Sequence, residues 1–230
     1  MSEKKQTVQI EQAIDIPSGN VQLEGELKLP KGASGVVLFA HGSGSSRHSP
    51  RNQYVARTIR EAGVGTLLFD LLTKDEEAVD AYTRQLRFDI NLLARRLVDA
   101  TNWVAGQPAT QHLRIGYFGA STGAAAALIA AVDLPDIVAA VVSRGGRPDL
   151  AGDALPKVKA PTLLIVGGND DVVIGMNQEA YAKLTCEKQL KIVPGATHLF
   201  EEPGTLEQVA QLAGIWFKNK LQPQASAHGT

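Results

Sequence analysis

The 230-residue sequence has little of several features that define whole classes of protein. It holds a single cysteine, Cys186, so an internal disulfide is excluded and no cysteine spacing suggests a metal site. We interpret Cys186 as a small packed hydrophobe. No apolar run approaches the length of a membrane span, and the first residues lack the apolar core of a signal peptide. We therefore expect a cytoplasmic, soluble protein without a membrane partner.

The sequence also lacks an excess of either charge. It has 23 Lys and Arg residues against 24 Asp and Glu residues, a formal net charge of −1, and the basic residues are scattered along the chain. A surface that follows nucleic-acid phosphates needs clustered positive charge, so we expect no nucleic-acid partner.

The apolar content, 44% of the residues, is enough for one sizeable core. We therefore predict a single domain over residues 8–221. The two ends, residues 1–7 and 222–230, are polar and are expected to be flexible.

Apolar periodicity predicts strands that alternate with helices along most of the chain. The expected strands are residues 8–16, 21–29, 35–40, 64–69, 115–118, 137–142, 161–166 and 189–193. The expected helices are residues 50–62, 84–106, 122–132, 175–184 and 205–220, the last beginning with a capping box at residues 205–208. The pattern is typical of an α/β fold with a mostly parallel sheet, helices on both faces and an N-terminal antiparallel hairpin.

Two segments between these elements bear on how open a site would be. The charged run at residues 74–80 is interpreted as a solvated loop. Residues 143–160, between two consecutive strands, are too few for a helical lid. We therefore expect no cap domain and an open, shallow site.

Residues 119–123, Gly-Ala-Ser-Thr-Gly, are the stretch around which the chain is organised. A strand-like apolar run precedes them, and an alanine-rich run of high helix propensity follows. A G-x-S-x-G sequence at such a strand-turn-helix junction strains its central residue and lifts the Ser121 side chain above the sheet edge. The alternative is a glycine-rich turn with Ser121 as a helix N-cap.

A serine nucleophile needs a base to accept its proton and a third group to orient that base. Of the five histidines, His198 follows the last predicted strand and so falls at the same sheet edge as Ser121. A loop histidine without a role is the alternative. The acid is expected after the strand at residues 161–166, where Asp170 and Asp171 are adjacent and where either aspartate could simply shape the turn or cap the next helix.

The same chemistry needs backbone N–H groups that stabilise the negative oxygen of a tetrahedral intermediate. We predict that these oxyanion donors are the N–H groups of Thr122, directly after the nucleophile, and of Ser43, in the glycine-rich loop at residues 41–46. Phosphate binding is the alternative for that loop, but it has neither a Walker A pattern nor G-x-G-x-x-G. We expect no cofactor and no metal.

Five basic residues, Arg47, His48, Arg51, Arg144 and Arg147, fall in loops at the same predicted edge. They are candidates for substrate binding because the planar guanidinium fork of arginine fits an anionic group. Surface salt bridges are the alternative.

The chain order Ser121, Asp170, His198 resembles the α/β-hydrolase fold, and the compact form is similar to the dienelactone hydrolase family. The segments that carry the resemblance are FAHGSGSSRHSPRN, TLLFDLLT, GYFGASTGAAAAL, LLIVGGNDDVV and PGATHLF. In that family the acid follows a glycine by three residues and precedes a valine by three. Gly167 and Val173 satisfy both conditions for Asp170, so the resemblance implies Asp170 rather than its neighbour.

The resemblance has limits at the substrate. Members that act on dienelactones use a cysteine in the elbow, whereas this chain has Ser121, so the fold and the triad arrangement are implied but the lactone substrate is not. The stretch HGSGSSRHSPRN resembles small serine hydrolases, some of which are fused to phosphoribosyltransferases.

We predict a serine hydrolase that cleaves small carboxylic esters, with short acyl groups preferred. The alternatives are an acyltransferase or a peptidase with the same triad, and a non-catalytic binding protein on this fold. The expected partner is a small-molecule ester, and the sequence leaves the natural substrate and the oligomeric state open.

Overall fold

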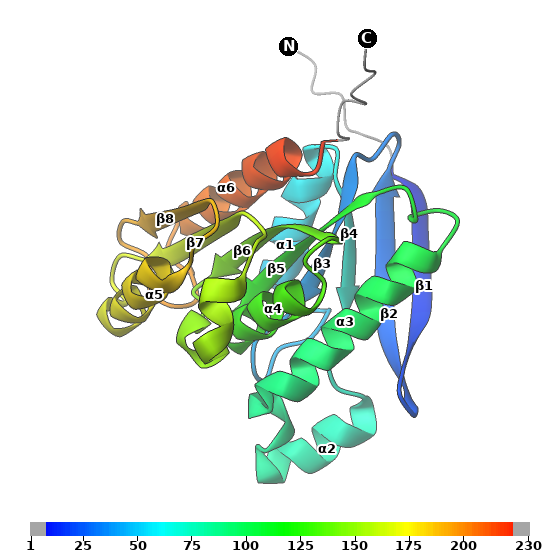
Figure 1. The fold of residues 1–230 in the computed structure, drawn as a ribbon, viewed down its shortest axis with the longest axis horizontal. Helices are drawn as coiled ribbons and strands as arrows, with labels where there is room; N and C mark the ends of the chain where they lie inside the picture. The colour runs from blue at the N-terminus through cyan, green and yellow to red at the C-terminus, as the bar shows by residue number, and fades with distance from the viewer. Residues whose placement is uncertain (1–7, 223–230) are drawn as a thin grey trace.

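The computed structural model describes residues 8–222, and an eight-stranded sheet forms its centre (Figure 1). The strands are β1 (Val8–Ser18), β2 (Val21–Pro30), β3 (Gly35–Ala40), β4 (Gly65–Phe69), β5 (Arg114–Ala120), β6 (Val138–Arg144), β7 (Thr162–Gly167) and β8 (Lys188–Val193). They lie in the order β1-β2-β4-β3-β5-β6-β7-β8. β1 pairs antiparallel with β2, and β2 with β4, while the remaining pairs are parallel. The predicted parallel sheet with a hairpin at one edge is confirmed.

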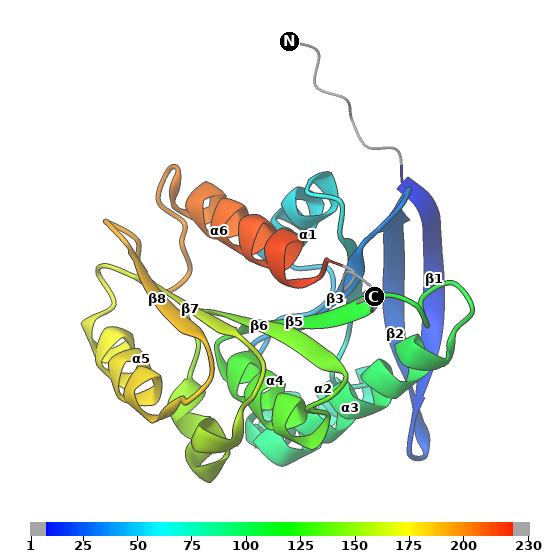
Figure 2. The same ribbon diagram turned by 45° about the horizontal axis from the view of Figure 1, so that its top comes forward.

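Helices cover both faces of this sheet (Figure 2). α1 (Pro50–Glu61) and α6 (Thr205–Lys220) lie on one face, and α3 (Ile90–Gly106), α4 (Thr122–Asp133) and α5 (Asp171–Lys183) lie on the other. Each face has its own apolar core, and β3 contributes to both because successive strand residues point to opposite sides. Val37 and Phe39 pack toward α1 and α6, whereas Leu38 packs toward α3 and α4.

The segment after β4 differs from its prediction. Residues 74–80, interpreted as a solvated loop, belong to helix α2 (Lys74–Thr83). A capping box begins this helix: the Thr73 side chain accepts the N–H of Glu76, and the Glu76 carboxylate accepts the N–H of Thr73 at 2.8 Å. Acidic residues in the first turn also interact favourably with the positive end of the helix dipole. The charge of the run therefore stabilises a helix here.

The predicted helix from residue 84 is also wrong at its start. Arg84 ends α2 in a left-handed conformation with φ 56°, and a short 3₁₀ turn, η1 (Leu86–Phe88), follows. The Asp89 side chain then accepts the N–H of Leu92 at 2.9 Å, so α3 begins only at Ile90.

Two helix starts near the end of the chain differ from the predictions as well. α5 begins at Asp171, four residues earlier than expected. α6 begins at Thr205 as predicted, but the capping box does not form: Gly204 is the N-cap, and the Thr205 hydroxyl donates backwards to the carbonyl of Glu202 at 2.7 Å.

Between β6 and β7 the chain makes only a short 3₁₀ segment, η2 (Pro148–Lys157), so no cap domain is inserted there. No helix within residues 8–222 combines the length and the apolar character that crossing a bilayer requires. Of the ends predicted to be flexible, residues 1–7 and 223–230 lie outside the described residues.

Candidate active site

The turn from β5 into α4 holds Ser121 in a strained backbone conformation, with φ 50° and ψ −122°. A residue with a side chain rarely adopts a positive φ and does so where its surroundings enforce it. Close packing enforces it here. A Cβ on Gly119 would lie 2.5 Å from Cα of Ala124, and one on Gly123 would collide with the carbonyl oxygen of Ala40. Within the described residues the Ser121 side chain makes no capping hydrogen bond to α4.

His198 and Asp170 meet at the carboxyl edge of the sheet. Asp170 follows β7 and His198 follows β8, and these strands are parallel neighbours, so their loops emerge side by side. Nδ1 of His198 lies 2.7 Å from Oδ2 of Asp170. With the Nδ1 proton donated to the carboxylate, Nε2 carries the lone pair that a base needs. Phe200, buried and at φ 55°, anchors the loop that carries His198.

Ser121 and His198 both line one cavity of about 760 Å³. Its other lining residues include His41, Gly42, Ser43, Gly44, Ser45, Ser46, His48, Ser49, Pro50, Arg51, Leu71, Leu72, Glu77, Asp80, Arg87, Leu93, Arg144, Gly145 and Leu199. Among the hydrogen bonds of residues 8–222 none joins the Ser121 hydroxyl to His198. Contacts of this kind are often long until substrate is bound.

The N–H groups predicted as oxyanion donors lie beside the nucleophile. The N–H of Ser43 donates to the side-chain hydroxyl of Thr122 at 3.1 Å, and the two hydroxyls are 3.0 Å apart. Gly42 makes this approach possible, because a Cβ there would lie 3.0 Å from Cβ of Ser121. The Ser43 loop is thus held directly against the turn that carries Ser121.

One wall of the cavity comes from a segment that the sequence reasoning missed. Glu77 and Asp80 of α2, and Arg87 of η1, line the cavity. Asp80 is almost fully buried, and its carboxylate accepts the Nε–H of Arg87 at 2.5 Å and the N–H of Leu86 at 2.7 Å. The available signal was the Thr73–Glu76 capping box, which predicts a helix at this place.

An ion pair between a buried arginine of α3 and a half-buried glutamate of α2 joins the two helices. The guanidinium of Arg96, only 6% exposed in its side chain, donates twice to the carboxylate of Glu76 at 2.5 Å and once to the carbonyl of Leu71 at 2.7 Å. Hydrogen bonding from Arg96 holds the pKa of Glu76 below its usual value, against the opposing effect of burial. The α2 wall is therefore tied to the end of β4.

The five basic candidates separate into two groups. Arg47 pairs with Asp70 and Glu24, and Arg147 pairs with Asp149 through two hydrogen bonds of 2.9 and 2.8 Å. The structure does not bring these two into the cavity lining. His48, Arg51 and Arg144 do line it, and Arg51 also reaches Glu201 at 3.1 Å.

His41 is a buried histidine beside the cavity. Its Nε2 accepts the N–H of Leu71 at 3.0 Å, and its Nδ1 faces the carbonyl of Gly42 at 3.0 Å. This pairing fits a neutral ring with the proton on Nδ1. Burial lowers the pKa of His41 below its ordinary value, so the ring stays neutral and fixes the loop before Ser43.

Comparison with known proteins adds independent findings. The sequence profile of the dienelactone hydrolase family matches residues 23–216. The crystal structure of a dienelactone hydrolase from Anabaena variabilis ATCC 29413 superposes with a TM-score of 0.91 at 62% sequence identity, covering 93% of this chain and 99% of that chain. Est1E from Butyrivibrio proteoclasticus shares the fold, with a TM-score of 0.76 at 17% identity, covering 91% of this chain and 98% of that chain.

A curated relative from Mycobacterium tuberculosis (strain ATCC 25618 / H37Rv) bears the name "Putative phosphoribosyl transferase". It is 59% identical over 211 residues, which are 92% of this chain and 47% of the relative, so this chain spans about half the length of that protein. The profile match over residues 23–216 and the 62% identity to the Anabaena enzyme lead to one assignment. The chain belongs to the dienelactone hydrolase family, within the α/β-hydrolase superfamily.

Proposed function

We propose that this chain is a serine hydrolase that cleaves small carboxylic esters through an acyl-enzyme on Ser121. The observation that carries the proposal is the convergence of two features on one cavity: a strained Ser121, and a His198 ring held by Asp170 at 2.7 Å. A weakly nucleophilic hydroxyl needs such a base and such an orienting acid. Membership in a family of hydrolases supports the same chemistry.

In the proposed reaction, the hydroxyl oxygen of Ser121 attacks the ester carbonyl carbon while Nε2 of His198 takes the proton. Asp170 holds the ring with its Nδ1 protonated and stabilises the positive charge that forms on it. The carbonyl oxygen becomes negative and accepts hydrogen bonds from the N–H groups of Thr122 and Ser43.

The tetrahedral intermediate then collapses, and His198 gives its proton to the leaving alkoxide. A water molecule attacks the acyl group on Ser121, with His198 again accepting a proton, and the carboxylic acid leaves. The Ser121 hydroxyl is restored, so the net reaction is ester plus water giving acid plus alcohol.

Three alternatives remain on this fold. An acyltransferase would pass the acyl group from Ser121 to an alcohol or an amine, and a peptidase would take the acyl group from an amide. A binding protein would keep the fold without turnover. The name of the Mycobacterium relative belongs to a protein about twice as long as the matched segment. We assign hydrolase chemistry to the matched segment.

A fluorophosphonate probe tests the nucleophile directly. We expect wild type to be labelled and to turn over p-nitrophenyl acetate, and Ser121→Ala to lose labelling and at least about 10⁴-fold of the turnover. Ser45→Ala is the matched control, because Ser45 lines the same cavity and takes no part in the reaction that we propose. Equal labelling of wild type and Ser121→Ala would refute the proposal.

A second measurement separates hydrolysis from transfer and defines the acyl group. Product analysis with an added alcohol or amine should show free acid as the main product, whereas dominant ester or amide formation would support transfer. Across p-nitrophenyl acetate, butanoate and palmitate, we expect the short esters to be preferred. Comparable turnover of butanoate and palmitate would contradict a site for small acyl groups.

A further inference from the structure

Arg144 is a buried cation at the edge of the candidate site. It is the last residue of β6, and its carbonyl accepts the N–H of Ser121 at 3.3 Å, so the two residues are neighbours across the sheet. The whole residue is only 8% exposed, yet it lines the cavity that contains Ser121. Its Nε and Nη1 atoms are buried and have no hydrogen-bond partner among the described residues.

This lack of a partner is unusual for the region. Arg47 and Arg147 each hold a carboxylate, and Arg87 holds that of Asp80. Burial, together with the smaller effect of the like charge of Arg51, lowers the pKa of Arg144 to about 10. The guanidinium still carries its proton at neutral pH. A buried charge without a counter-ion is costly, and such groups in proteins are normally paired.

Other features of the same wall are also positive. Ser49, Pro50 and Arg51, at the N-terminal end of the twelve-residue helix α1, line the cavity beside Arg144. The first turn of α1 has no acidic residue to offset the positive end of the helix dipole. Arg51 adds a second guanidinium, which pairs with Glu201 at 3.1 Å but whose Nε is buried and has no partner among the described residues.

The acidic residues of the cavity lining come from a different element. Glu77 and Asp80 belong to the α2 wall, and Asp80 is already bound to Arg87. Among the described residues of the lining, β6 therefore contributes an arginine without a carboxylate partner, whereas α2 contributes the carboxylates of Glu77 and Asp80. An anionic group that enters the cavity would be drawn toward Arg144 and away from α2.

We propose that Arg144, assisted by Arg51 and the first turn of α1, binds an anionic oxygen group of the substrate, a carboxylate or a phosphate. The guanidinium fork matches both groups, since each offers two oxygens to parallel N–H donors. This inference rests on the proposed function, because the anion belongs to the molecule that Ser121 attacks. The preferred substrates are then esters that carry a negative charge within reach of the elbow.

Matched pairs of esters test the preference. One pair places the charge on the acyl side, the mono-p-nitrophenyl ester of adipic acid against its methyl ester. The other places it on the leaving group, para-acetoxybenzoate against its methyl ester. A phosphonate analogue, para-acetoxyphenylphosphonate, separates phosphate from carboxylate recognition. The measured quantity is the ratio of kcat/KM for the charged ester to kcat/KM for the neutral one.

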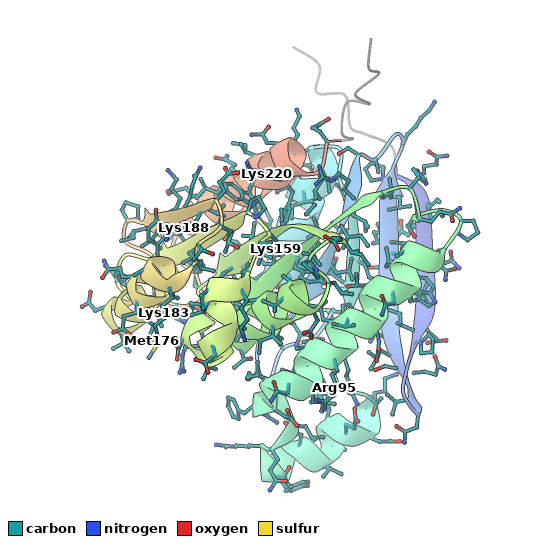
Figure 3. All side chains as sticks on the ribbon, in the orientation of Figure 1. Arg95, Lys159, Met176, Lys183, Lys188 and Lys220 are labelled. Atoms are coloured by element: carbon teal, nitrogen blue, oxygen red, sulfur yellow. The ribbon has the colours of Figure 1, made fainter. Side chains whose placement is uncertain are left out.

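We expect wild type to favour the charged member of at least one pair and Arg144→Met to lower that ratio by about 10- to 100-fold. Arg144→Lys, which keeps the charge without the fork, should fall between them. Arg95→Met is the control that removes the same charge from an exposed site on α3 (Figure 3), and it should change the ratio by less than about twofold. Because a ratio is measured, a general loss of activity in a variant cancels.

Binding without turnover keeps this inference separate from the proposed function. Ser121→Ala should show a saturable rise in melting temperature with inorganic phosphate or with adipate, beyond that of sodium chloride at equal ionic strength. Adding Arg144→Met should abolish the rise. Failure of wild type to hydrolyse any ester, with anion binding intact, would refute the hydrolase proposal alone. Ester hydrolysis with no preference for charge in wild type, and no specific anion effect on Ser121→Ala, would overturn the anion site even if Arg144→Met fails to fold.

Discussion

Asp170 and His198 are joined by a 2.7 Å contact between Oδ2 and Nδ1, while the adjacent Asp171 is exposed and opens α5. Two neighbouring aspartates thus have separate surroundings. Asp170 sits at the N-cap position of α5, yet within the described residues its side chain makes no capping bond, because its carboxylate faces the imidazole. Asp171 lies in the first turn, where a negative charge interacts favourably with the helix dipole.

Replacement of each aspartate by asparagine should therefore affect kcat very differently. Asp170→Asn should lower kcat by about 10²- to 10⁴-fold, because an amide in that place no longer enforces the protonated Nδ1 or stabilises the imidazolium. Asp171→Asn should leave kcat within about twofold of wild type and lower the unfolding free energy by less than about 1 kcal/mol. Steady-state kinetics and urea unfolding of both variants check this. Similar kcat losses in the two variants would contradict the assignment of Asp170.

The contact between Ser43 and Thr122 leads to a second prediction. The Ser43 N–H that we assign to the oxyanion donates at 3.1 Å to the hydroxyl of Thr122, so the substrate oxygen has to replace that hydroxyl. Thr122→Val keeps the side-chain shape and both backbone N–H groups. We expect kcat/KM for p-nitrophenyl acetate to fall by no more than about tenfold, and the unfolding free energy to fall by about 1 kcal/mol for the lost hydrogen bond. A loss of about 10²- to 10³-fold would instead show that the hydroxyl itself acts as an oxyanion donor.

The sequence predicted the parts of the molecule that depend on local pattern. The hairpin follows from alternation in β1 and β2, and the β5–α4 turn follows from Gly119 and Gly123, whose missing Cβ atoms allow the close contacts found there. The prediction of a solvated loop at residues 74–80 is wrong because most of this segment is exposed but helical, and its charged residues also make tertiary contacts. In the fold Asp80 is buried against Arg87 and Glu76 is bound by Arg96, partners that lie 7 and 20 residues away.

The arginines also depend on tertiary contacts that the local sequence pattern does not predict. The sequence placed Arg47, Arg144 and Arg147 at one edge and could not tell which of them is neutralised. Pairing depends on tertiary contacts: Arg47 reaches Glu24 in the hairpin, whereas Arg144 enters a cavity wall without a carboxylate partner among the described residues. Side-chain burial and pairing of this kind follow from strand order, which local periodicity does not encode.

We expect the Arg96–Glu76 pair, which joins α2 to α3, to contribute to the free energy of unfolding. Arg96→Met leaves the carboxylate of Glu76 with only the N–H of Thr73 as a donor and removes the guanidinium donor of the Leu71 carbonyl, so we expect the unfolding free energy to fall by about 2–4 kcal/mol. Lys74→Met is the control, since Lys74 pairs with Glu24 through a side chain that is 77% exposed, and it should change stability by less than about 1 kcal/mol. Urea unfolding and a double-mutant cycle with Glu76→Gln provide the measurement. Equal effects of Arg96→Met and Lys74→Met would mean that the Arg96–Glu76 pair does not fix α2.

Burial of His41 should make the stability of the protein depend on pH. Burial lowers its pKa below the ordinary 6.5, so below that pH the unfolded chain binds a proton that the folded chain does not. Stability is then fully present above about pH 6.5 and falls as the pH decreases, with a contribution of up to about 1.4 kcal/mol per pH unit. In His41→Gln the group is absent, and its amide oxygen can still accept the N–H of Leu71. Urea unfolding from pH 8 to about pH 5 should therefore show a shallower decline for His41→Gln than for wild type. His112→Gln, at an exposed histidine, should keep the wild-type slope. Parallel curves for wild type and His41→Gln would show that protonation of His41 does not limit stability in acid.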